Sequence, residues 1–331
     1  MPTLPKPDYA ARMPEPSVRY LSRADVGAVG LTGLEVIEIL EAAFRAKRAG
    51  QVEMPPKIGV HPRPDAFIHA MPAYLADTDA VGVKWVAGYP DNQNLGLPYI
   101  HGLLVLTEAA TGRPLAIMDA TWITEVRTAA ASMLGIRALV DAPVDAIGIV
   151  GCGRQGKVHL ELAREVFPGL ARATVFDRHA ERAETLVAAH PELDIGIAPR
   201  AEQAGEGAQV VITTAAIVRD PERLLGRTQL ADASVACAID FDAMLSEDIF
   251  EGAALFVVDD IPQYLHYREQ GYFAGYPDDP VELCEAIAPD AAHPPGLRVL
   301  VPLGLALDDV AVAAEVHRRA SEAGIGRELP L

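Results

Sequence analysis

The sequence predicts an α/β protein with two domains: a Rossmann-type doubly wound parallel sheet and a second, strand-rich α/β domain for substrate binding and dimerisation. Two observations predict the Rossmann part. Short apolar runs alternate with helical patterns after about residue 135, and the glycine-rich turn GCGRQG follows one of these runs. The third observation is that the region before it is mainly strand-like. A chain of 331 residues is long enough to bury two cores.

The first domain is predicted to span residues 1–134 and to be completed by residues 305–331. Its first 16 residues form a Pro-rich arm, and GLEVIEILEAAFRAKRAG then has the pattern of an amphipathic helix that ends at Gly50. FIHAMPAYL, AVGVKWVAGYP and YIHGLLVLTEAATGRPLAIMD follow as strands, with a Thr-Gly turn inside the last segment. The C-terminal DDVAVAAEVHRRASEAGIG is helical and can pack back on either domain.

The Rossmann domain is predicted to span residues 135–304. Its apolar runs indicate buried parallel strands, and they are DAIGIV, ATVFD, AQVVITTAA, SVACAID and ALFVVDD. The helical patterns GKVHLELAREVF and ERAETLVAAH follow the first two runs. Strands that alternate with helices in this way form a parallel sheet with helices on both faces.

Composition excludes several classes of protein. A net charge of −18 argues against a nucleic-acid partner, because phosphate binding needs a clustered basic face. No apolar run reaches the roughly 18–20 residues that span a membrane, so we expect no membrane association and a cytoplasmic location. The three cysteines, Cys152, Cys237 and Cys284, have no metal-site spacing, and we expect no bound metal.

The glycine-rich turn predicts a dinucleotide site. Gly151 permits the tight turn, Gly153 lets the backbone approach a pyrophosphate, and Gly156 allows close packing of helix and strand. Arg154 and Gln155 lie between these glycines and belong to the same predicted site. The N-terminus of the following helix offers N–H donors to the phosphates.

Asp177 ends the second strand, about 20 residues after the turn, where an acid accepts hydrogen bonds from the ribose hydroxyls. This favours NAD(H) over NADP. Arg178 and Arg182 keep NADP open, because an adjacent arginine can hold a 2′-phosphate.

Several segments resemble the ornithine cyclodeaminase/mu-crystallin family: MPPK, VKWVAGYPDN, TGRPLAIMDATWITEVRTAAAS before the glycine-rich strand, and LGLALDD near the C-terminus. The resemblance covers most of the chain in the same order. It implies a homodimer made through the first domain, NAD(P) between the domains and a small amino or imino acid as substrate. It also implies that Lys57 and Arg127 hold the substrate carboxylate and that Lys84 is the active-site lysine. The guanidinium plane suits a bidentate carboxylate contact.

The same resemblance implies an acid near the nicotinamide, just after the SVACAI strand. AIDFDAM offers Asp240 and Asp242, and it lacks the GGDxPGK pattern of cyclodeaminases. Asp240, at the strand end, is the better match, although the spacing to Glu247 does not decide between the two. Both acids could instead cap a loop.

Other departures bear on the reaction. His69 stands where cyclodeaminases have a glutamate, Tyr99 where they have a threonine, and Pro302 where they have a serine. His69 and His101 are predicted to lie in the cleft and to bind a polar or second anionic group of the substrate. The aromatic segment 259–280 could serve packing or cover the cofactor edge.

Three functions follow from the resemblance. The first is an NAD(H)-dependent imine reductase or amino-acid dehydrogenase, with hydride transfer at the α-carbon. The second is a cyclodeaminase, an ammonia lyase that recycles NAD. The third is a non-catalytic binder of the crystallin type. The departures from GGDxPGK and from the glutamate favour the first, and the retained lysine, arginine and aspartate count against the third.

Overall fold

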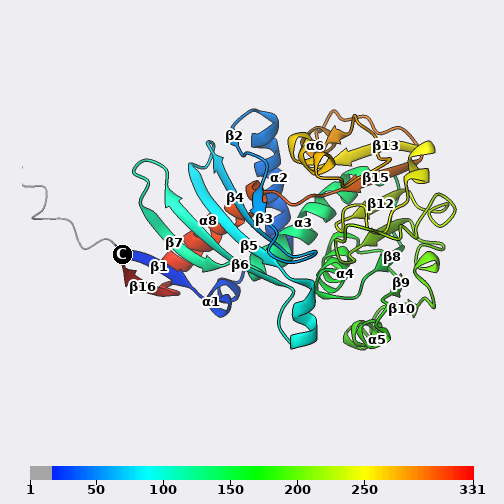
Figure 1. The fold of residues 1–331 in the computed structure, drawn as a ribbon, viewed down its shortest axis with the longest axis horizontal. Helices are drawn as coiled ribbons and strands as arrows, with labels where there is room; N and C mark the ends of the chain where they lie inside the picture. The colour runs from blue at the N-terminus through cyan, green and yellow to red at the C-terminus, as the bar shows by residue number, and fades with distance from the viewer. Residues whose placement is uncertain (1–16) are drawn as a thin grey trace, which may run out of the picture.

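The computed structural model describes residues 17–331, so the predicted N-terminal arm lies outside the described residues. Two sheets lie next to each other along the long axis of the molecule, each with its own helices (Figure 1). The predicted fold class is confirmed: one sheet is strand-rich and mixed, and the other is a parallel Rossmann sheet.

The first sheet is mainly antiparallel, with β1 and β7 as a parallel pair. Its strands lie in the order β16 (Arg327–Pro330), β1 (Ser17–Leu21), β7 (Pro114–Asp119), β6 (Ile100–Glu108), β5 (Ala80–Gly88), β4 (Phe67–Leu75) and β2 (Val52–Glu53), and β3 (Ile58–Val60) also pairs with β4. The first and last described strands therefore lie together at one edge, where β1 pairs with β16.

Helices cover one face of this sheet. Those that pack on its strands are α1 (Arg23–Ala28), α3 (Thr121–Leu139) and α8 (Ala306–Ala323). Helix α2 (Gly33–Arg48) packs on α3 and α8, and the short helix η2 (Pro90–Leu95) lies between β5 and β6. The predicted C-terminal helix, α8, packs on β4, β5 and β6 of this sheet (Figure 1). Thr32 caps α2 through a capping box with Glu35, which satisfies N–H groups at the start of the helix.

The Rossmann sheet is parallel throughout. Its order is β10 (Asp194–Ile197), β9 (Arg172–Phe176), β8 (Ala146–Val150), β11 (Val210–Thr213), β12 (Val235–Ala238), β15 (Leu297–Val301), β13 (Ala253–Val258) and β14 (Val281–Glu282). Its helices are α4 (Arg154–Val166), α5 (Ala180–Ala189), α6 (Ile261–Glu269), α7 (Leu283–Ala286) and the short η3 (Ala201–Gln203) and η4 (Glu247–Glu251).

Helix α3 joins the two domains. It packs on α2 and α8 of the first domain and on α4, β12 and β15 of the second. The predicted boundary between residues 134 and 135 lies inside this helix, and the predicted return at residues 304–305 lies in the loop between β15 and α8. Both connections between the domains therefore lie at the junction of the two domains (Figure 1).

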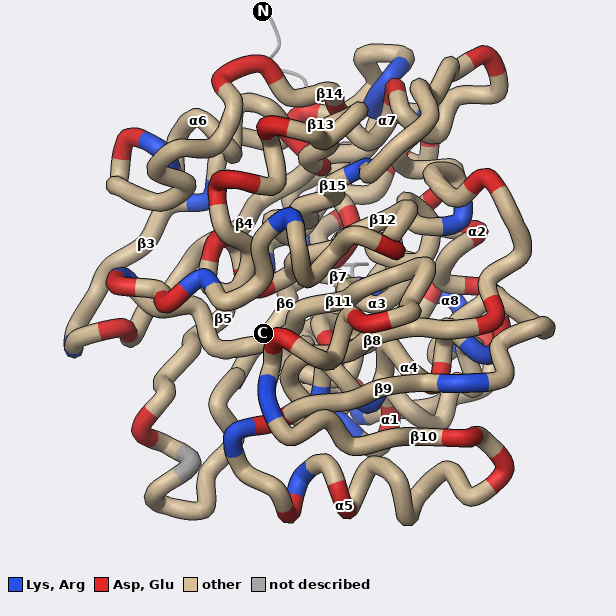
Figure 2. The backbone as a smooth tube through the Cα atoms, turned by 90° about the vertical axis from the view of Figure 1, so that its right-hand side faces the viewer, with Lys and Arg blue, Asp and Glu red and all other residues tan. Residues whose placement is uncertain are grey.

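Charged residues of both signs are spread along the chain. In the view of Figure 2, acidic segments are distributed over the Rossmann side and basic segments lie among them. Within residues 17–331, no helix combines the length and apolar character that a membrane span requires.

Candidate active site

A cleft of ≈ 1660 Å³ lies at the junction and is lined by both domains. Glycines of the predicted dinucleotide turn line it from the Rossmann side. The three predicted basic residues, Lys57, Lys84 and Arg127, line the same cleft. The structure therefore brings together two groups of residues that are far apart in the sequence.

The glycine-rich turn leaves room for phosphates. Gly151 has φ +105°, and a Cβ there would lie 2.6 Å from Thr214 Oγ1. A Cβ on Gly156 would lie 1.9 Å from the carbonyl oxygen of Gly151, so only glycine fits. Gly153, the N-cap of α4, has no atom within 4 Å of its Cβ position and no side-chain cap. The N-terminus of α4 thus has free N–H groups and open space in front of them for an anion. The residues of the turn therefore fit a dinucleotide pyrophosphate.

Asp177 lies beside the glycine-rich turn in the same cleft. Its carboxylate accepts hydrogen bonds from the backbone N–H of Cys152 at 2.8 Å and of His179 at 2.8 Å. These contacts hold the acid against the glycine-rich turn, where it lines the cleft together with Arg178 and Arg182.

Arg154 and Gln155 also line the cleft, as predicted residues of the turn. The Arg154 guanidinium pairs with Glu125 of α3 at 2.7 Å, so this ion pair joins the two domains at the cleft. The backbone carbonyl of Gln155 contacts the ring of buried His159 at 2.8 Å, which ties the turn to its own helix.

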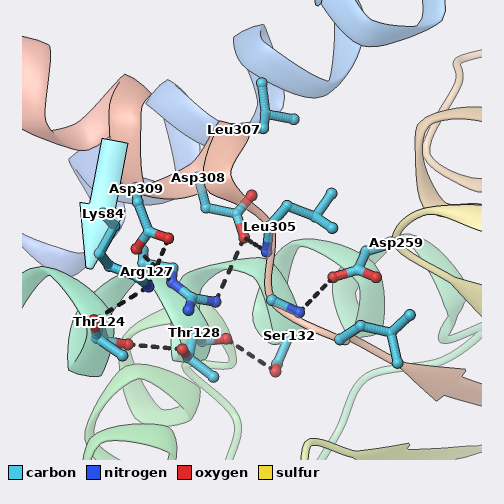
Figure 3. A network of polar contacts seen from close by, with 12 residues as sticks. Lys84, Thr124, Arg127, Thr128, Ser132, Asp259, Leu305, Leu307, Asp308 and Asp309 are labelled. Atoms are coloured by element: carbon cyan, nitrogen blue, oxygen red, sulfur yellow. Dashed lines mark hydrogen bonds and ion pairs between the residues drawn. The ribbon is translucent and has the colours of Figure 1, made fainter. Parts of the chain in front are cut away.

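Lys84 lies on β5 with 1% of its side chain exposed. Its ammonium pairs with Asp309 of α8 at 2.6 Å and donates to Thr124 of α3 at 3.4 Å (Figure 3). Burial lowers the pKa of Lys84 to about 8, and the positive charge of Arg127 acts in the same direction, while Asp309 opposes both. A lysine in this state can exchange a proton near neutral pH.

Arg127 lies on α3 beside the same acid. Its Nε donates to Asp309 at 3.0 Å, and a terminal nitrogen lies 3.6 Å from Asp308 (Figure 3). Gly304 makes room for the guanidinium, since a Cβ there would lie 2.7 Å from Arg127 and the backbone has φ +79°. Burial alone would lower the pKa of Arg127, but Asp309 and Asp308 outweigh it and raise this pKa.

Lys57 also contacts the loop at Gly304. Its ammonium donates to the carbonyl oxygens of Leu303 at 2.7 Å and Gly304 at 3.3 Å, and Gln263 accepts from its backbone N–H at 2.8 Å. Burial and the positive charges of Arg127 and Lys84 lower the pKa of Lys57 to about 7, although Asp259 opposes them.

Three buried acids lie behind these cations: Asp259 after β13, and Asp308 and Asp309 at the start of α8. The three cations are among the described residues that line the cleft, whereas these three acids are not. Burial raises the pKa of Asp308 to about 7 and that of Asp259 to about 6. The sequence analysis does not include these acids among the predicted site residues, although LGLALDD, one of the segments that resemble the family, contains Asp308 and Asp309.

The prediction that His101 lies in the cleft is wrong. His101 pairs with Ala87 in the β5–β6 ladder, whereas Lys84 pairs with Leu104. Side chains alternate along a strand, so His101 and Lys84 point to opposite faces of the sheet. His101 is exposed on the face that α8 does not cover, beside Leu103 and Trp85.

His69 does line the cleft, next to Phe67, whose ring stacks on it at 4.4 Å. Burial lowers the pKa of His69 to about 3, and Lys57 adds to this effect. The ring is therefore neutral at pH 7 and adds no positive charge. Tyr99 and Pro302 line the cleft as well.

Asp240 is buried just after β12. Its two oxygens accept hydrogen bonds from Thr213 at 2.6 Å and from the backbone N–H of Ala215 at 2.8 Å. Asp242 pairs with Arg223 at 2.5 Å and accepts from the backbone N–H of Phe273. Neither acid is among the described residues that line the cleft, and the acid beside Lys84 is Asp309.

This architecture defines a two-domain protein with a dinucleotide-type Rossmann turn facing a cationic site. The model of the ornithine cyclodeaminase/mu-crystallin family matches residues 18–324, so the chain belongs to this family and the resemblance is confirmed.

Relatives and solved structures match over nearly the whole chain. The nodulation efficiency protein NfeD of Rhizobium meliloti is 34% identical, over 93% of this chain and 97% of its own. The structure of Δ1-pyrroline-2-carboxylate reductase of Thermococcus litoralis, in complex with NADH and L-proline, is 26% identical with a TM-score of 0.82, over 94% and 100% of the two chains. An archaeal alanine dehydrogenase dimer with bound NAD is 28% identical with a TM-score of 0.83, over 95% and 99%.

Proposed function

We propose that this protein is an NAD(H)-dependent oxidoreductase that acts on the C–N bond of a small 2-imino or 2-amino acid. One observation carries the proposal: Lys57, Lys84 and Arg127 line the same cleft as the glycine-rich turn. The similar reductase and dehydrogenase structures, which hold NADH and NAD, support it.

Lys57 and Arg127 would hold the substrate carboxylate. Both lie beside Gly304, and burial removes most of the water around their charges, so that charge-assisted hydrogen bonds are strong there. Asp308 and Asp309 fix the Arg127 guanidinium from behind, so that it is oriented before substrate arrives.

Lys84 would supply the proton at the substrate nitrogen. Bound NADH supplies a hydride to the α-carbon, so reduction of an imine also needs one proton. Lys84 is the ionisable cleft residue whose position Asp309 and Thr124 fix, and its pKa of about 8 leaves the ammonium protonated at neutral pH and able to donate. Lys84 is thus proposed to transfer this proton without Asp240, the acid that the sequence predicts near the nicotinamide.

The assay is NADH consumption with ammonium and a panel of 2-oxo acids, followed by absorbance. Stoichiometric consumption with amino-acid formation supports the reductase. A constant NADH level while ornithine yields proline and ammonia would contradict it and support a cyclodeaminase. Tight NADH binding without turnover on any substrate would support a non-catalytic binder.

NAD(H) is the proposed cofactor, because Asp177 occupies the place where a 2′-phosphate would bring like charge. Fluorescence titration with NADH and NADPH tests this. At least tenfold tighter binding of NADH is expected, and equal affinity would assign Arg178 or Arg182 to a 2′-phosphate.

We further propose a homodimer formed through the uncovered face of the first sheet. Tyr20, Trp85 and Leu103 are 38%, 42% and 43% exposed, which is unusual for a row of large apolar side chains. A dimeric alanine dehydrogenase structure supports this assembly. Light scattering should give twice the mass of one chain, and Trp85→Glu should give a monomer. A wild-type monomer would contradict the proposal.

The cytoplasmic location stays a prediction from the sequence.

A further inference from the structure

Aromatic rings form one wall of the cleft beside Lys57. Phe241, Tyr267 and Tyr272 line it. The ring of Phe241 lies 4.6 Å from that of Tyr267 and 5.6 Å from that of Tyr272, and Tyr267 lies 5.7 Å from Tyr272. The Lys57 ammonium is 5.1 Å from the centre of the Tyr267 ring and 5.8 Å from that of Phe241. A carboxylate held by Lys57 would therefore bring the rest of the substrate against these rings.

Both neighbouring acids hold Phe241 in place. Its φ of +61° lies in the left-handed region, which is unfavourable for a bulky residue, so surrounding contacts must maintain it. Asp240 fixes one side of it through Thr213 and Ala215, and Asp242 fixes the other side through Arg223 and Phe273. The two acids of AIDFD thus hold the Phe241 ring where it lines the cleft.

A second pair of rings enters the cleft from β4. Phe67 and His69 stack with an interplanar angle of 20°. The charges that act on His69 are those of Lys57, Lys84, His61 and His266, and burial together with these charges keeps the ring neutral. This pair therefore adds apolar surface near the cations.

The charges near Tyr272 do not single out a charged substrate side chain. Arg219, Asp65 and Asp242 act on Tyr272, and Asp242 is itself paired with Arg223, so the charges near this ring offset one another. A cationic side chain would lie near Lys57 and Lys84, which repel it. An uncharged ring gains stacking contacts from the wall instead.

We propose that the cleft selects a 2-imino acid with an aromatic side chain. This inference rests on the proposed function, because Lys57 and Arg127 must hold the carboxylate. The imine forms from the 2-oxo acid and ammonia with loss of water. Its C=N bond then takes the hydride of NADH at carbon and a proton at nitrogen, which gives the amino acid and NAD+.

The test compares phenylpyruvate, pyruvate and oxaloacetate at saturating NADH and ammonium. We expect kcat/KM for phenylpyruvate to exceed that for both others at least tenfold. A preference for pyruvate or oxaloacetate, with normal NADH consumption, would overturn this inference and leave the proposed function standing. No consumption with any 2-oxo acid would overturn the proposed function, and the inference with it.

Two matched variants locate the selectivity. Tyr272→Leu removes a ring that lines the cleft, and Phe250→Leu removes a ring of the neighbouring aromatic cluster, 4.5 Å from Tyr276. Tyr272→Leu should lower the ratio of kcat/KM for phenylpyruvate over pyruvate by about three- to tenfold, the range of an aromatic pair. Phe250→Leu should leave this ratio unchanged, and both variants should bind NADH like the wild type. An unchanged ratio in Tyr272→Leu, or an equal loss in both variants, would contradict the inference.

Discussion

Replacing Asp309 with asparagine removes the charge that positions both Lys84 and Arg127. The Asp309 carboxylate is fully buried and bridges the two cations, at 2.6 Å from Lys84 and 3.0 Å from Arg127. Asparagine keeps the size of the side chain and one acceptor oxygen. The variant therefore tests the charge more than the packing.

The magnitude follows from the burial of the pair. Breaking a buried ion pair by removing one partner destabilises a protein by about 3–5 kcal/mol. The acid also favours the protonated ammonium, so its loss lowers the pKa of Lys84 further below about 8. Two unit charges about 4 Å apart interact by about 4 kcal/mol at an effective dielectric constant of about 20. Since 1.36 kcal/mol corresponds to one pKa unit, we expect the pKa of Lys84 to be at least about one unit lower in Asp309→Asn than in the wild type.

The assay is the pH profile of kcat/KM for imine reduction between about pH 6 and 9. Lys84 must be protonated to donate, so wild-type activity should fall as pH rises through about 8. In Asp309→Asn this fall should occur at least one pH unit lower. The control is Glu282→Gln, which removes an acid paired with Lys47 at 2.5 Å outside the cleft and should leave the profile in place. An unchanged profile in Asp309→Asn would refute the role of this pair.

Three further variants test the site. Lys84→Ala should lower kcat at least about 100-fold with NADH affinity unchanged, and loss of NADH binding would refute its role. Gly156→Ala should weaken NADH binding at least about tenfold, because its Cβ would lie 1.9 Å from the Gly151 carbonyl oxygen; unchanged fluorescence titration would contradict this. Arg127→Lys should raise KM for the substrate at least about tenfold, since an ammonium cannot make the bidentate contact; an unchanged KM would exclude that contact.

The Rossmann part could be predicted from the sequence because its signals are local. A buried strand, the glycine-rich turn and the start of α4 are consecutive, and Asp177 follows at the end of the next strand. Lys57 comes from the segment before β3, Lys84 from β5 and Arg127 from α3, so their meeting in one cleft is a long-range property. Only the family resemblance indicated that these three residues share one cleft.

Strand register explains why His101 was misplaced. The sequence indicates a strand at YIHGLLVL, but it does not give the face on which each residue lies until the pairing with β5 is known.

Asp309 was missed for a different reason. Two acids in the first turn of a helix usually stabilise its N-terminus, and Asp308 does accept the backbone N–H of Leu305. Nothing local in the sequence shows that Asp309 faces Lys84 across the domain.

The central claim is that NADH is consumed by hydride transfer to the substrate α-carbon in this cleft. The most direct measurement uses NADH deuterated at C4 on the transferred face, ammonium and the best 2-oxo acid, with mass spectrometry of the amino-acid product. We expect one deuterium at the α-carbon for each NADH consumed, and a transfer at least about 100-fold slower in Lys84→Ala. Product formation without consumption of NADH, or consumption without deuterium at the α-carbon, would contradict this claim.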